Sequence, residues 1–145
     1  MNFCHKFLFF LFLIIPNISA DELSIKLLGQ NKAGILNLAI YDNAEAFDRS
    51  VKGEGRSEGG FFSGIDSFIE LKESHEFVIN LPEGIYAIAL FIDANKNMKI
   101  DKNFLGIPKE QYGFSNNAMG NLSGPSFEQA KFQVKGNSIQ NIKLK

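Results

Sequence analysis

Four oxygen-bearing side chains recur at short, regular intervals in one polar stretch of the chain. Asp93, Asn95, Asn97 and Asp101 stand two or four residues apart, directly after an almost wholly apolar run. A hard cation such as calcium takes carboxylate and amide oxygens at this spacing from a tight loop. The stretch therefore predicts a calcium site whose ligands are Asp93, Asn95, Asn97 and Asp101.

The same loop differs from a strong calcium site in its turn, its last ligand and its charge. Counted from Asp93, position 6 is Met98, where a sharp turn favours glycine, and position 12 is Phe104, where a bidentate glutamate would sit. Three lysines outnumber the two aspartates of the loop. Glu110 supplies a further ligand only if the chain folds back. The expected affinity is that of weak extracellular sites, about 10⁻⁴–10⁻³ M, and the alternative is a plain loop whose Asx side chains bond their own backbone.

The stretch that follows, residues 104–118, mixes aromatic rings with hydrogen-bonding groups. A ligand surface combines groups of these two kinds. We therefore expect a ligand to contact Tyr112, Phe114, Asn116 and Asn117. The alternative is structural: the aromatic rings cover an open sheet face, and the two asparagines bond loop backbone.

No spacing of residues predicts a catalytic centre, and no residue is assigned as catalytic. His75 lies in a predicted turn, and a Ser–His–Asp site would require it to meet a distant serine in space. A second function class is a small hydrolase of sugar or peptide that uses Asp93, Asp101 or Glu110 as acid and base. Its distinguishing sign is a concave pocket into which two carboxylates converge, one of them with a raised pKa.

Residues 1–20 have the form of a secretory signal peptide. Lys6 supplies a positive charge, Phe7–Ile15 is an uninterrupted apolar run, and Ala20 is a small residue before the expected cleavage. This apolar run is too short to span a bilayer, which needs about 20 residues. We expect a mature domain of residues 21–145 without a membrane span, located in the periplasm or secreted.

Charge and cysteine content restrict what this mature domain can be. It carries 14 Lys and Arg (15 less Lys6) against 16 Asp and Glu, a net charge of −2, which argues against nucleic acid as a partner. The single cysteine, Cys4, precedes residue 21, so no disulfide can form within residues 21–145. One histidine is too few for a multi-histidine metal centre. A domain of this length can instead be held by its own core.

Apolar and polar residues alternate with the period of a strand over most of residues 21–145. The pattern predicts strands near residues 23–27, 35–41, 68–71, 76–81, 85–92, 130–134 and 142–144. Gly136-Asn137 is typical of a hairpin turn. Many short strands with frequent turns predict an all-β fold, a single antiparallel β-sandwich of about seven strands, immunoglobulin-like or transthyretin-like.

One predicted strand, residues 85–92, is apolar on both faces. Such a strand is central and is covered on each side. The opposite sheet is one expected cover. The other is either a single helical turn through Phe47, capped by Asp42 or Asn43, or residues 104–118 folded back over the sheet.

A set of short motifs gives the chain a resemblance to a known family. The motifs are Leu81-Pro82-x-Gly84-x-Tyr86, Asp93-x-Asn95-x-Asn97, Asn103-x-x-Gly106-x-Pro108 and Tyr112-Gly113-Phe114-Ser115-Asn116-Asn117. With them, the mature chain resembles the bacterial secreted family catalogued as domain of unknown function 2141. The resemblance implies an exported β-sandwich without established activity, and many members carry glycine where this chain has Met98. The first motif also resembles a turn of transthyretin-like and carboxypeptidase-regulatory-like sandwiches, which are often binding or stabilising modules.

These features together predict an exported, non-enzymatic binding or scaffold module of the bacterial envelope. Its working face is expected in residues 93–118, ordered by weak calcium binding, with an unknown envelope ligand or protein as partner. Two alternatives stay open: the small hydrolase, and a purely structural domain in which residues 93–118 only cover the core.

Overall fold

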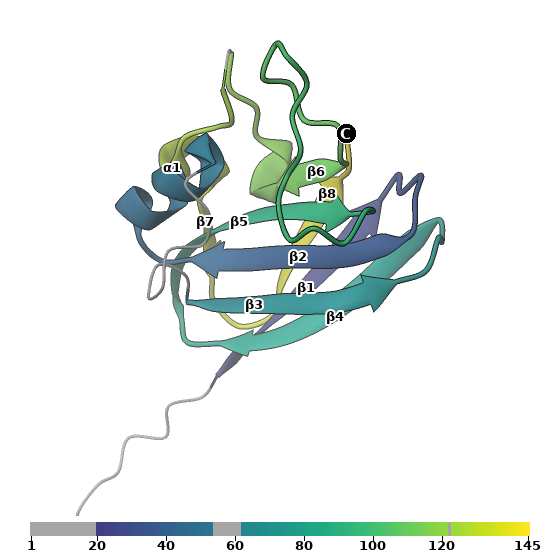
Figure 1. Cartoon of the computed structure of the whole chain (residues 1–145). Coiled ribbons are helices and arrows are strands. Elements are labelled where there is room, and N and C mark those ends of the chain that lie inside the picture. The colour runs from purple at the N-terminus through teal and green to yellow at the C-terminus, as the bar shows by residue number, and fades with distance from the viewer. Residues whose placement is uncertain (1–19, 54–61, 122) are drawn as a thin grey trace, which may run out of the picture.

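The computed structural model describes residues 20–53, 62–121 and 123–145, which form two β-sheets with short helices beside them (Figure 1). The predicted signal peptide lies outside these residues, apart from Ala20. The strands are β1 Asp21–Leu28, β2 Gly34–Tyr41, β3 Ser63–Ile69, β4 Ser74–Leu81, β5 Gly84–Asp93, β6 Tyr112–Phe114, β7 Phe132–Val134 and β8 Ser138–Lys143. The helices are α1 Ala44–Lys52, the 3₁₀ turn η1 Ser115–Asn117 and α2 Phe127–Ala130.

The strands form a smaller sheet in the order β4-β1-β8 and a larger sheet in the order β3-β2-β5-β6, with β7 also paired to β5. The mostly antiparallel, all-β prediction is confirmed, with eight strands in the described residues rather than about seven. One strand pair departs from the antiparallel prediction, because β1 and β8 run parallel, with Leu23 opposite Ser138.

The hairpin predicted at Gly136-Asn137 is wrong. The strands on either side of this turn do not pair with each other, since β7 pairs with β5 and β8 pairs with β1. Gly136 has a φ of 61°, so it does make a tight turn. The turn carries the chain from the larger sheet to the smaller one instead of reversing it within one sheet.

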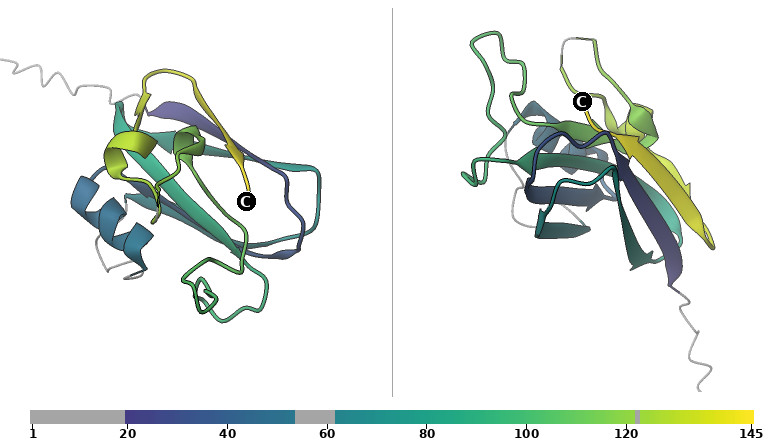
Figure 2. Two further views of the ribbon diagram at one scale, coloured as in Figure 1. Left: turned by 90° about the horizontal axis from the view of Figure 1, so that it is seen from above. Right: turned by 90° about the vertical axis from the view of Figure 1, so that its right-hand side faces the viewer.

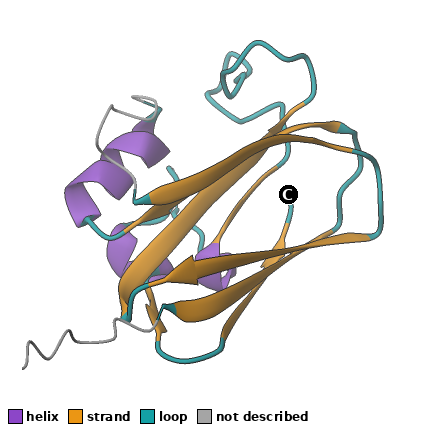
Figure 3. Ribbon diagram, turned by 90° about the horizontal axis from the view of Figure 1, so that it is seen from below, coloured by secondary structure: helices purple, strands orange, loops and turns teal. Residues whose placement is uncertain are grey.

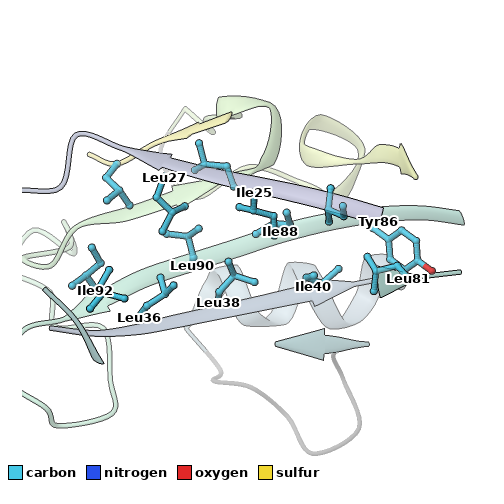
Figure 4. Close-up of a cluster of buried hydrophobic side chains, with 14 of the residues drawn as sticks. Ile25, Leu27, Leu36, Leu38, Ile40, Leu81, Tyr86, Ile88, Leu90 and Ile92 are labelled. Atoms are coloured by element: carbon cyan, nitrogen blue, oxygen red, sulfur yellow. The ribbon is translucent and has the colours of Figure 1, made fainter. Parts of the chain in front are cut away.

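The main core fills the space between the two sheets (Figure 4). Alternate residues of β1, β2 and β5 point into it, as the period of two requires. Leu23 and Ile25 from β1 belong to one cluster with Leu38 and Ile40 from β2, and all four are fully buried. Each such side chain stabilises the fold by about 1.5–3 kcal/mol relative to exposure.

The outer face of β5 is covered by helices, which lie outside the strands in Figure 3. Helix α1 begins at Asn43, whose Oδ1 accepts a hydrogen bond from the Ala46 N–H at 3.0 Å, and it ends at Gly53 with a φ of 91°. Of the two predicted caps, Asp42 and Asn43, the structure uses Asn43, and the helix is longer than the single predicted turn. Buried Phe47 makes edge contacts with the rings of Tyr41, Phe114 and Phe127. The second cover therefore combines both predicted alternatives: helices α1 and α2 pack there with Phe114 and Ala118, whereas Phe104, also predicted as a cover, is exposed.

The motif Leu81-Pro82-x-Gly84-x-Tyr86 builds the corner between β4 and β5. The Tyr86 hydroxyl donates to the Pro82 carbonyl oxygen at 3.0 Å. A Cβ on Gly84 would lie 3.1 Å from the Tyr86 ring, so glycine lets the ring lie closer to the chain than a larger residue would. Burial, followed by the nearby charge of Asp42, raises the pKa of the Tyr86 hydroxyl. The spacing of the motif therefore places the Tyr86 hydroxyl where it can bond the carbonyl oxygen of Pro82 across the turn.

Candidate functional site

Residues 94–111, which we call the projecting loop, connect β5 to β6 and stand away from the two sheets (Figure 2). The loop contains two parts with different structures. Residues 94–101 form a polar turn at the end of β5, and residues 102–108, which we call the tip, form a small hairpin with an isolated bridge between Lys102 and Pro108.

Asp93, the last residue of β5, anchors the polar turn. It is fully buried, and its carboxylate accepts from the backbone N–H groups of Asn97 at 3.2 Å and Met98 at 2.7 Å. Lys96 and Met98 both have left-handed backbone conformations, with φ values of 62° and 64°. Met98 thus occupies a position where glycine is favoured on conformational grounds.

The other three predicted calcium ligands lie together in the same turn. The side-chain amide of Asn95 donates to Asp101 at 2.6 Å, and that of Asn97 donates to both Asp101 carboxylate oxygens at 3.1 Å. The oxygens of the two asparagine side chains accept from the backbone N–H groups of Asn97 and Lys99. This is the bonding of Asx turns.

The structure thus brings Asp93, Asn95, Asn97 and Asp101 into one hydrogen-bond network. Within residues 20–53, 62–121 and 123–145, no group of three or more His, Cys, Asp or Glu side chains is placed to hold a metal ion. Calcium binding by the four residues stays a prediction.

Glu110 lies beside the polar turn, because the chain folds back after the tip. Its Oε2 accepts from the Asp101 N–H at 3.1 Å, whereas its buried Oε1 has no hydrogen-bond partner among the described residues. Burial raises the pKa of Glu110, and the charges of Asp93 and Asp101 add to that effect, while the N–H groups of Asp101 and Ala94 act against it. Glu110 is therefore a buried carboxyl group that is only half satisfied.

The tip exposes three apolar side chains. Phe104 is 95% exposed, Leu105 67% and Ile107 54%. Asn103 orders the backbone beneath them, since its Oδ1 accepts from the N–H groups of Leu105 at 2.9 Å and Ile107 at 3.0 Å. Reasoning from the sequence did not find this feature, although the signal is present in the apolar residues between Lys102 and Lys109.

The chain then returns to the sheet, and Tyr112 and Phe114 belong to β6. Phe114 lies opposite Ala89 of β5 and contacts Phe47. Tyr112 and Lys145 exchange two backbone hydrogen bonds, of 3.2 and 3.0 Å, which join β6 to the chain after β8.

Asn116 and Asn117 bond backbone groups on neighbouring elements. The Asn116 amide donates to the carbonyl oxygens of Ala130 and Lys131. The Asn117 amide donates to the Asn141 carbonyl at 2.9 Å, and its oxygen accepts from the Lys143 N–H at 2.7 Å. Asn117 thus pairs with the edge of β8 much as a neighbouring strand would.

Ser115, part of the same sequence motif but not among the predicted ligand contacts, is fully buried beside Asn116 and Asn117. Its hydroxyl donates to the Ala130 carbonyl at 2.6 Å and accepts from the Ile88 N–H at 2.8 Å. It therefore ties β5 to the end of α2.

Three of the four predicted ligand contacts border a shallow depression, and Asn116 does not. Its lining residues are Tyr112, Gly113, Phe114, Asn117, Ala118, Met119, Lys143 and Lys145. The depression has no room for an enclosed water molecule, whereas sites for small molecules usually enclose several hundred cubic ångströms. Ligand contact by Tyr112, Phe114, Asn116 and Asn117 stays a prediction.

Comparison with known proteins identifies the family. A family model described as "Uncharacterized protein conserved in bacteria (DUF2141)" matches residues 29–142, and the chain belongs to this family. The resemblance seen in the sequence motifs is thereby confirmed. No curated protein and no solved structure matches the chain. None of the helices in the described residues is long and apolar enough to cross a membrane.

Proposed function

We propose that this protein is an exported, non-enzymatic binding module of the bacterial envelope, and that the projecting loop is its working face. The observation that carries the proposal is the apolar tip. Phe104, Leu105 and Ile107 are exposed together at the end of the loop, where they contribute little to the core. Single exposed apolar residues are ordinary, but a cluster of them marks a surface for interaction.

The structure of the tip supports the proposal, because the three side chains stand on an ordered backbone. The Asn103 N–H donates to the Ile107 carbonyl, and the Lys109 N–H donates to the Asp101 carbonyl, at 2.9 and 2.8 Å. A backbone already fixed in one conformation loses less entropy when a partner binds. The tip is therefore suited to recognition.

The carboxylates near the tip favour binding over catalysis in this proposal. Asp93 and Asp101 accept hydrogen bonds from the loop's own donors, so they shape the loop. The hydrolase alternative has one observation in its favour, the raised pKa of Glu110 beside these two residues. Glu110 is 9% exposed, which leaves little of it open to a substrate.

Site-specific photo-crosslinking tests the working face. A photoreactive phenylalanine analogue is placed at position 104 of the full chain in the native host, and a matched analogue replaces Ile139, which is 67% exposed on β8. We expect envelope components to be captured from position 104 and not from position 139. Equal capture from both positions, or none from position 104, would contradict the proposal.

We also propose that calcium orders the projecting loop, with Asp93, Asn95, Asn97 and Asp101 as ligands. The supporting observation is the buried Glu110 Oε1, which has no hydrogen-bond partner in the described residues and lies in a carboxylate-rich setting. A cation would compensate such a group.

Calorimetric titration tests the calcium proposal. We expect weak binding, with a dissociation constant of about 10⁻⁴–10⁻³ M, that Asp101→Asn weakens further. Asp66→Asn, on β3 and outside the loop, is the matched control. Absence of binding heat up to about 10 mM calcium would refute calcium ordering and leave the working face untouched.

A further inference from the structure

The apolar tip has features that specify the chemistry of its partner. We propose that the tip inserts past the headgroups to the boundary with the acyl chains in a membrane of anionic lipids, with Phe104, Leu105 and Ile107 as the inserted side chains. This inference rests on the proposed function, because it names what the working face binds. The protein then lies on the membrane by one loop, without spanning it.

The first argument is the hydrogen bonding of the tip backbone. The N–H groups of Leu105 and Ile107 donate to the Asn103 side chain, the N–H of Gly106 donates to the Asn103 carbonyl, and Pro108 has no N–H. A backbone entering an apolar medium must satisfy its donors internally, since lipid offers no partners there. The tip already does so over most of its length.

The second argument is charge. Residues 102–109 contain Lys102 and Lys109 at the base of the tip and no acidic residue. Both lysines are exposed, as are Lys143 and Lys145 near the C-terminus, which lies on the same side of the sheets as the tip (Figure 1). Lysines beside an inserted apolar group face the headgroups, where anionic lipids attract them.

These two arguments together favour lipid over a protein groove. A protein partner would offer donors and acceptors to the loop, so it would not require the tip backbone to bond internally, although the fixed conformation suits either kind of partner. A surface that is negatively charged outside and apolar within matches both the lysines and the self-bonded backbone.

A single tryptophan provides a direct readout, because the chain contains none. Phe104→Trp places the reporter in the tip, and Ile139→Trp places it on β8 as the matched control. Phe104 is 95% exposed, so the variant keeps the core intact, and circular dichroism checks the fold. Leu105→Trp is the second reporter in case the first variant folds poorly.

The reporters are titrated with vesicles of phosphatidylglycerol and phosphatidylethanolamine, and separately with vesicles of phosphatidylcholine. We expect a blue shift of the tip reporter, and its quenching by brominated lipid, with the anionic vesicles only. The Ile139→Trp protein should show neither change. Absence of the shift with anionic vesicles, or an equal shift with neutral ones, overturns the inference.

Charge variants sharpen the test. Lys102→Gln with Lys109→Gln should weaken binding to anionic vesicles by about fivefold for each lysine removed. The control pair, Lys32→Gln with Lys72→Gln, alters exposed lysines outside the tip and should leave binding unchanged. Equal weakening by both pairs would mean attraction by total charge, which contradicts insertion at the tip.

The remaining outcomes separate this inference from the proposed function. A blue shift that grows with protein concentration without vesicles would identify a second copy of the chain as the partner and overturn the lipid inference. Crosslinks from position 104 to protein, without vesicle binding, would overturn it and leave the working face standing. If position 104 yields neither crosslinks nor vesicle binding, both proposals fail.

Discussion

The projecting loop and the segment that follows it, residues 112–118, use the same residue types in different ways. Each contains phenylalanine, glycine and asparagine. In the loop, Phe104 is almost fully exposed, whereas Phe114 in the following segment packs against Phe47. The presence of a phenylalanine beside glycine and asparagine therefore does not decide which of the two stretches belongs to the core.

Hydrogen-bond partners explain the difference. Asn103 bonds its own loop, so the tip is ordered but independent of the sheets. Asn116 and Asn117 bond α2 and β8, which are distant in sequence. Local hydrogen bonding therefore gives a segment that projects from the sheets, whereas long-range hydrogen bonding fixes a segment to the core.

The largest expected effect is at Ser115, which holds residues 112–118 in place. Ser115→Ala removes two buried hydrogen bonds and leaves the Ile88 N–H unsatisfied, so we expect the free energy of unfolding to fall by about 3 kcal/mol. Urea denaturation measures it, with exposed Ser123→Ala as the control. An equal fall in the free energy of unfolding of the two variants would show that the buried hydrogen bonds of Ser115 do not fix residues 112–118 to the core.

The next effect is at Asn117. Asn117→Ala removes both bonds to β8 and leaves alanine with a φ near 51°, so stability should fall by about 2 kcal/mol. Thermal unfolding measures the loss, and exposed Asn137→Ala, in the turn before β8, serves as the control. A change in both variants of less than about 0.5 kcal/mol would show that the β8 edge does not need this side chain.

A smaller effect, with a distinctive pH dependence, is expected at Glu110. Because its folded pKa is raised above the unfolded value of 4.5, its contribution to stability is fully present below pH 4.5 and is lost as pH rises through the folded pKa. Glu110→Gln removes this loss, so at neutral pH the variant should be more stable than the natural chain.

Paired denaturation curves at several pH values test this prediction. The stability difference between Glu110→Gln and the natural chain should grow from pH 4.5 upward and then level off. A difference independent of pH would show that the negative charge of Glu110 does not destabilise the folded protein. Glu128→Gln, exposed on α2, is the control.

Met98 should show a gain instead of a loss. Met98→Gly relieves a left-handed backbone, which costs about 1–2 kcal/mol for a side-chain-bearing residue, and part of the gain is offset by the greater freedom of glycine when unfolded. We expect a net stabilisation of about 0.5 kcal/mol. Met119→Gly, which lacks the positive φ, should be destabilising, and the same sign in both variants would refute the explanation.

The smallest effect is expected at the tip. Phe104→Ser should change the free energy of unfolding by less than about 0.5 kcal/mol, because the side chain has little contact to lose. Phe114→Ser, which removes the ring packed on Phe47, should destabilise the protein clearly. Similar losses in the two variants would place the tip in the core.

Much of this fold was predictable from the sequence, because strand alternation and local caps depend on neighbouring residues. Asn43 as the cap of α1 and the doubly covered β5 are examples. The parallel pairing of β1 with β8 was not predictable, since nothing in either strand specifies a partner so far along the chain. The wrong hairpin prediction at Gly136-Asn137 has the same cause. The residues of a turn determine that the chain bends, but they do not determine which strand the next segment pairs with.

The candidate site was predicted less completely. The spacing of Asp93, Asn95 and Asn97 correctly indicated a tight Asx-rich loop, and Met98 does adopt the conformation favoured for glycine. The exposed tip was missed, because the sequence alone does not distinguish an apolar residue that is exposed from one that is buried in the core. Only the long-range contacts of residues 112–118 show which aromatic residues the fold uses.

The position of β1 between β4 and β8 has a consequence for the newly made chain. Leu23 pairs with Ser138, so two neighbouring strands of the smaller sheet are the first and the last of the described strands. Until β8 has been made, β1 has an unpaired edge on that side. The smaller sheet therefore cannot close before more than a hundred further residues have followed β1, and during that interval the edge of β1 is accessible to chaperones and proteases.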